Sequence, residues 1–112
     1  MKYKVIELKN YVPAAAKTEI MFEIASERAS GTELVRFNIK RIDDERAYRR
    51  AVSAFLRLIK QMKERGAVQF FATPESFSEL STEARFLLNK YPDLFADIPT
   101  EDESGTFVYV RV

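Results

Sequence analysis

The chain contains neither cysteine nor histidine, and these two absences exclude several kinds of site. Without cysteine there is no disulfide framework, no thiol nucleophile and no thiolate metal site. Without histidine the chain lacks the commonest zinc ligand and the side chain that most often moves protons near neutral pH. Only carboxylate, lysine, serine or tyrosine chemistry is left for catalysis. We therefore expect no catalytic residues, no metal, no cofactor and no enzymatic activity.

Long apolar runs are missing as well. No stretch of 18 apolar residues occurs, and the opening MKYKVIEL has neither the apolar core nor the cleavage site of a secretory signal. We expect a cytoplasmic protein that makes no membrane contact. The 112 residues fit one domain, 1–112, because a chain of this size buries a sufficient core and no linker or repeat divides it.

The charges are unevenly distributed, although the formal net charge is only +1. Residues 40–65 hold nine Lys or Arg against four Asp or Glu, whereas residues 75–104 hold eight acidic residues against two basic ones. A net charge near zero does not by itself predict a nucleic-acid or membrane partner. The segregation predicts either that the two regions face each other or that the surface has opposite poles.

Alternating and β-branched apolar residues predict four strands, at residues 3–8, 33–39, 67–72 and 106–112. The last of them, TFVYVRV, is so rich in β-branched and aromatic residues that we expect it in a central or well-covered position. Strands that alternate with helices favour parallel pairing, and the last strand can join in either direction.

Three helices are expected between these strands. Pro13 favours a helix start, and the first helix is predicted over residues 13–30 with a stripe formed by Ile20, Met21, Ile24 and Ala25. The second is predicted over residues 43–65, and a third over residues 79–90 within an acidic insertion at about 73–104. The expected fold class is α/β, a two-layer β-α-β-α-β-(α)-β sandwich with a four-stranded mixed sheet and an inserted helix before the last strand.

The second helix has two contrasting faces. Its apolar face is formed by Tyr48, Val52, Phe55, Ile59 and Met62. The opposite face is formed, at 4-3-4-3 spacing, by Arg46, Arg50, Ser53, Arg57 and Lys60.

Several local strings, together with this element order, resemble the small MutS-related (Smr) domain, a two-layer α/β module of proteins that act on DNA or RNA. IELKN at 6–10 falls where Smr domains have Leu-Asp-x-His-Gly, and VR at 35–36 opens the second strand in the same manner. RRAV at 49–52 is similar to the Arg-x-Ala-Val of the family's next helix, and GTFVYV at 105–110 is similar to its final glycine and strand. The resemblance covers the chain apart from the acidic insertion.

The chain departs from the Smr pattern at the positions that carry chemistry. Lys9 and Asn10 replace the histidine and glycine of the first motif, and IKRI at 39–42 replaces His-Gly-x-Gly. Glycines there would let backbone amides approach a phosphate, which Asp43 and the two acidic residues after it would repel. Only Glu7, at the family's aspartate position, keeps a carboxylate, and a residual role for it stays open. A nuclease activity is the least expected function.

The first functional hypothesis is a non-catalytic interaction module that binds a protein partner or a second copy of itself. Its proposed contact residues are Tyr3, Phe71, Phe107 and Tyr109 on the sheet face opposite the two main helices, and Phe22 on the first helix. An open aromatic face of this kind needs a cover. Either the inserted helix provides one, or the sheet face forms a dimer. Phe22 alternatively packs under a neighbouring segment.

The second hypothesis is binding of RNA or single-stranded nucleic acid through the basic face of the helix at 43–65, because cations hold phosphates and aromatic rings stack on bases. The candidate contacts are Arg36, Arg46, Arg50, Arg57, Lys60 and Arg111. The alternative is an ordinary solvated helix face. The acidic run at 101–103 is a candidate mask for these cations.

Overall fold

The computed structural model describes residues 3–8, 13–94 and 105–112. The elements, in chain order, are β1 (Tyr3–Leu8), α1 (Pro13–Ala29), β2 (Leu34–Lys40), α2 (Glu45–Glu64), β3 (Phe70–Ala72), α3 (Pro74–Ser78), α4 (Thr82–Lys90) and β4 (Gly105–Arg111).

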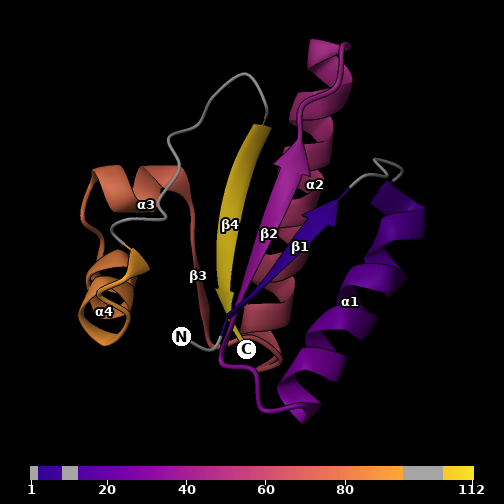
Figure 1. The fold of residues 1–112 in the computed structure, drawn as a ribbon. Coiled ribbons are helices and arrows are strands. Elements are labelled where there is room, and N and C mark those ends of the chain that lie inside the picture. Colours follow the sequence, from indigo (N-terminus) through magenta and orange to yellow (C-terminus); the bar gives the residue numbers. More distant parts are fainter. Residues whose placement is uncertain (1–2, 9–12, 95–104) are drawn as a thin grey trace.

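The four strands form one mixed sheet in the order β1-β2-β4-β3 (Figure 1). β1 and β2 are parallel, and β4 lies between β2 and β3, antiparallel to both. The central position expected for β4 is confirmed, and four consecutive residues from Phe107 to Val110 are buried there. The mixed α/β fold class with a four-stranded mixed sheet is also confirmed.

α1 and α2 cover one face of the sheet and enclose the larger core (Figure 1). Phe55 of α2 packs against Phe37 of β2, with 5.2 Å between the ring centroids. α2 begins at Glu45, two residues later than expected, because the Asp44 side chain caps it by accepting a hydrogen bond from the Ala47 amide at 3.1 Å.

α1 is rotated relative to the stripe predicted for it. Ile20 and Ile24 are buried as expected, but Met21 and Ala25 lie at the surface. The buried side of the helix is formed by Ile20, Ile24 and Glu27. The buried carboxylate of Glu27 accepts hydrogen bonds from the Lys4 Nζ at 2.9 Å and the Thr32 hydroxyl at 2.7 Å, so the Glu27 side of the helix faces β1.

The inserted helix predicted at 79–90 is confirmed as α4, which begins at Thr82, and the described part of the insertion also forms a short helix, α3, that was not predicted. Thr73 caps α3, with its hydroxyl accepting from the Ser76 amide at 3.3 Å. Leu80 then takes a positive φ of 50°, and Ser81 caps α4 by accepting from the Ala84 amide at 3.1 Å. Two caps and a left-handed residue therefore divide the segment.

α3 and α4 lie over β3 and β4 on the face opposite α1 and α2, and they form a second core there (Figure 1). Phe107 and Tyr109 are only 2% and 0% exposed. The aromatic face is therefore not an open patch, because Phe77 of α3 packs on both rings, at centroid distances of 6.1 and 5.6 Å.

The assignment of Phe71 to this aromatic face is wrong. Phe71 is opposite Val110 in the sheet register, and both side chains contribute to the core under α1 and α2. Its neighbour Phe70 takes the aromatic side and packs against Phe86 of α4, at a centroid distance of 5.4 Å. β3 is also shorter than the predicted strand. Because successive side chains of a strand point to opposite faces of the sheet, a shift of one residue moves each side chain to the other face.

Candidate nucleic-acid interface

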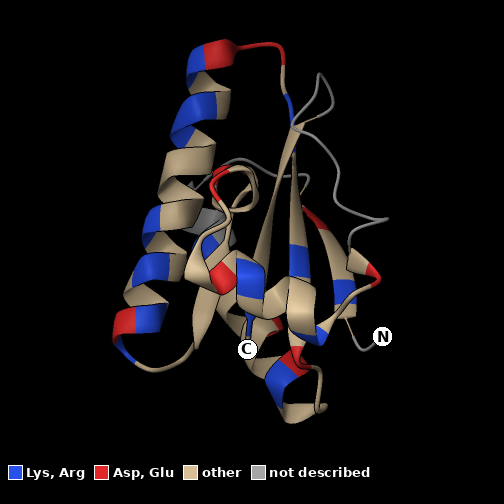
Figure 2. Cartoon of the chain, turned by 90° about the vertical axis from the view of Figure 1, so that its left-hand side faces the viewer, with Lys and Arg blue, Asp and Glu red and all other residues tan. Residues whose placement is uncertain are grey.

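The outer face of α2 carries four exposed cations in one line. They are Arg46, Arg50, Arg57 and Lys60. Figure 2 shows basic segments recurring along this helix, with acidic residues at its two ends. None of the four cations forms an ion pair with any residue in the described ranges. We call these four residues the basic face.

Two further residues predicted for this interface do not lie with the basic face. Arg36 is on β2 and points to the opposite side of the sheet, where its guanidinium lies 5.6 Å from the centroid of the Phe107 ring. Arg111, at the end of β4, donates hydrogen bonds from Nη1 to the backbone oxygens of Glu33 and Val112, at 3.0 and 3.1 Å. Arg36 and Arg111 therefore lie on the sheet face opposite α1 and α2, and only the four cations of the basic face form a common surface.

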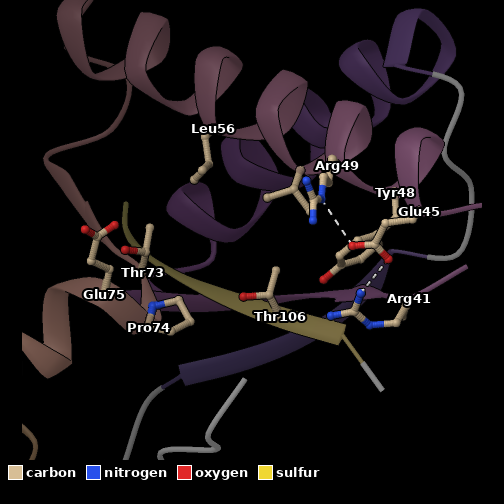
Figure 3. Close-up of a pocket in the computed structure, with 10 residues that line it drawn as sticks. Arg41, Glu45, Tyr48, Arg49, Leu56, Thr73, Pro74, Glu75 and Thr106 are labelled. Carbon is tan, nitrogen blue, oxygen red and sulfur yellow. Dashed lines mark hydrogen bonds and ion pairs between the residues drawn. The ribbon is translucent and has the colours of Figure 1, made fainter. Parts of the chain in front are cut away.

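A groove of about 550 Å³ runs beside α2 at the end of the sheet from which α2 begins (Figure 3). One wall is α2, and the other is the start of α3 at Thr73, Pro74 and Glu75. The groove exists because β3 ends at Ala72, opposite Tyr109, so Thr106 of β4 lies beyond the last residue of β3.

Two arginines at this groove share one carboxylate. Glu45 accepts a hydrogen bond from Arg41 at 3.1 Å and from Arg49 at 3.2 Å (Figure 3). The guanidinium of Arg41 also lies 4.5 Å from the centroid of the Tyr48 ring, which holds it in place. Glu75 on the opposite wall supplies a second carboxylate, so the groove is lined by two guanidinium groups and two carboxylates. Arg49 is 77% exposed and lies next to the basic face on the surface of α2.

Glu7, the carboxylate at the position where Smr domains have aspartate, lies on the other side of the sheet. Its Oε1 accepts a hydrogen bond from Asn38 Nδ2 at 2.8 Å, and Asn38 Oδ1 accepts from Arg36 Nε at 2.8 Å. Lys9, Asn10 and the acidic run at 101–103 fall outside the described residues. Within the described ranges, no three carboxylate, imidazole or thiol side chains come together as metal ligands would.

The groove cluster is the part of this surface that sequence reasoning missed. The signal is the spacing Arg41, Glu45, Arg49, in which each pair is four residues apart, as the two i,i+4 ion pairs show. In the sequence, Arg41 and Arg49 stand out only within the strings that were compared with Smr motifs, IKRI and RRAV. The carboxylate that the two arginines share was therefore not recognised.

Compared with family models, with curated proteins and with solved structures, the chain matches none of them. None of the helices in the described ranges is both long and apolar enough to cross a membrane.

Proposed function

We propose that this chain is a non-catalytic binding module that holds RNA or single-stranded nucleic acid along the outer face of α2. The observation that carries the proposal is the line of four exposed cations without a carboxylate partner among the described residues. From Arg46 to Lys60 the helix rises about 21 Å, a length that contacts several successive phosphates of one strand.

Arg49, the exposed arginine of the groove, supports the same class of ligand. Guanidinium groups bind phosphate in a bidentate manner, and the exposed Arg49 side chain is already oriented by Glu45. A strand that follows the basic face reaches Arg49 next, at the rim of the groove. The resemblance to Smr domains, which act on DNA or RNA, favours this ligand by analogy. We also propose that the protein is cytoplasmic, as the sequence predicts.

Binding of a protein partner through the aromatic sheet face loses its basis, because α3 and α4 bury Phe107 and Tyr109. The face that the first hypothesis needed is already occupied within the molecule. A protein partner or a second copy must therefore use another surface.

The test is fluorescence anisotropy of a short labelled single-stranded RNA, measured over a range of salt concentrations. Four phosphate contacts predict that affinity falls about 50-fold between about 50 and 200 mM salt. The double variant Arg50→Glu/Arg57→Glu removes two contacts and adds repulsion, so binding should be lost or its salt dependence should fall by at least half.

The matched control is Lys17→Glu/Arg85→Glu, which makes the same change in net charge at exposed sites on α1 and α4. Binding that persists in the control and disappears in the α2 variant supports the proposal. Equal loss in both variants indicates a nonspecific effect of net charge. Absence of binding by the unmodified chain at low salt contradicts the proposal outright.

A further inference from the structure

The groove between α2 and the start of α3 carries as much negative as positive charge. Arg41, Glu45 and Arg49 line it on the side of α2, and Glu75 lines it on the side of α3. A phosphate inside the groove would approach both carboxylates, so the groove suits an uncharged polar group better than an anion. Phosphates are expected on the basic face instead, where the described residues place no carboxylate beside the cations.

The carboxylate of Glu75 has no partner among the described residues. Glu75 is exposed and takes part in no ion pair or side-chain hydrogen bond within those ranges. Glu45, by contrast, accepts hydrogen bonds from two arginines. An ionised carboxylate is an acceptor only, so the Glu75 oxygens are available to N–H groups of a ligand in the groove.

The groove also has apolar walls. Val52 and Leu56 line it from α2, and Pro74 lines it from the start of α3. Leu56 points from α2 toward the α3 side of the groove (Figure 3). The volume of about 550 Å³ is typical of pockets that hold small molecules. A flat, uncharged ring fits between these apolar side chains, with a polar edge directed to Glu75.

The groove lies beside the basic face along α2. Consecutive helix residues are about 100° apart, so each α2 residue of the groove lies next to the residue that follows it, on the outer face. A strand whose phosphates contact the basic face can therefore turn a base into the groove. The neighbouring pairs are Glu45 with Arg46, Arg49 with Arg50, Val52 with Ser53, and Leu56 with Arg57.

We propose that this groove binds one guanine base of the single strand held along α2. The inference rests on the proposed function, because the phosphate contacts position the base. The Watson–Crick edge of guanine presents two neighbouring donors, the N1–H and the N2 amino group, which match the two oxygens of the Glu75 carboxylate. Adenine and cytosine place a ring-nitrogen acceptor beside the amino group, and uracil flanks its N–H with two carbonyl oxygens. A carboxylate repels these acceptors, so Glu75 selects guanine.

Fluorescence anisotropy with two labelled RNA octamers tests the site. One octamer contains uridine only, and the other has a single guanosine near its centre. The guanosine octamer should bind about tenfold more tightly, as expected for a bidentate contact to one base. Both affinities should fall in parallel as salt rises, because the base contact releases no counterions. An octamer with inosine, which lacks the N2 amino group, should lose most of the preference.

Glu75→Ala removes both acceptor oxygens from the groove. The guanosine octamer should then bind no more tightly than the uridine octamer, whose own affinity should change little. Glu79→Ala is the matched control, because Glu79 is exposed at the end of the same short helix, is not among the residues that line the groove, and carries the same charge. This control should keep the preference for guanosine, and thermal unfolding shows whether both variants remain folded.

The outcomes separate the guanine site from the proposed function. Equal affinity for the two octamers, or a preference that survives Glu75→Ala, overturns the guanine site and leaves phosphate binding along α2 intact. Absence of binding by both octamers at low salt contradicts the proposed function, and the guanine site fails with it.

Discussion

Gly105 shows how one residue can determine where a strand begins. It opens β4 with a φ of +140°, a conformation that side chains rarely adopt. A Cβ atom at this position would collide with the backbone oxygen of Ile39 in the neighbouring strand β2. Because that oxygen belongs to the sheet and cannot move freely, only glycine allows the close approach.

We expect Gly105→Ala to lower the free energy of unfolding by at least about 3 kcal/mol, because backbone strain and the collision add together. Urea denaturation measures this loss. Gly66→Ala is the control, since Gly66 also has a positive φ, of +78°, but open space around its Cα. It should cost about 1 kcal/mol. Equal costs at the two glycines would show that Ile39 does not constrain the position.

Tyr91 and Glu33 form a hydrogen-bonded pair that titrates outside the usual ranges. The Tyr91 hydroxyl donates to Glu33 Oε2 at 2.6 Å. Burial, together with the bond to Glu33, raises the pKa of Tyr91 to about 12. The same bond, helped by Lys90, lowers the pKa of Glu33. The pair joins the segment before β2 to the end of α4, so it connects the insertion to the sheet.

Tyr91→Phe should therefore cost stability in a pH-dependent manner, by about 2 kcal/mol near neutral pH. A raised tyrosine pKa means that its stabilisation is complete below about pH 10 and is lost as the pH rises toward 12. A lowered carboxylate pKa means that the contribution of Glu33 is lost as the pH falls below about 4. Denaturation of both proteins across this range measures the difference, and a difference independent of pH would contradict the role of the pair.

At the scale of the element, the sequence predicted what local patterns encode. The strongly two-sided pattern of α2 predicted its face correctly, and TFVYVRV predicted the covered position of β4. α1 lacks such a contrast, so its pattern did not show that Ile20, Ile24 and Glu27 form the buried side. Local patterns could not place Phe71 or divide the insertion, because these depend on strand register and on two side-chain caps.

α3 and α4 matter to the fold mainly through Phe77, which is 9% exposed and contacts two rings of β4. We expect Phe77→Ala to lower the free energy of unfolding by about 3 to 5 kcal/mol, since truncating a buried ring leaves a cavity. Phe86→Ala, at a half-exposed ring of the same insertion, should cost about 1 kcal/mol. Urea denaturation distinguishes the two. Similar small losses would mean that the insertion does not stabilise the sheet.

At the scale of the whole molecule, the two faces of the sheet are used differently. α3 and α4 cover the aromatic side over β3 and β4, whereas α1 and α2 cover the other side, and α2 carries the basic face. The basic face of α2 could be predicted because it is one helix stripe. That Arg36 and Arg111 lie away from the basic face could not be predicted, because their positions depend on how the strands and α2 pack together.

The most direct test of the proposed interface is an NMR titration of the isotope-labelled chain with a short single-stranded RNA at low salt. If the outer face of α2 binds the strand, the largest amide shifts will fall between Arg46 and Lys60. Amides of α1 and α4 will change little. Shifts concentrated around Glu7, Asn38 and Arg36 on the opposite sheet face, or no shifts at all, would contradict the assignment of binding to α2.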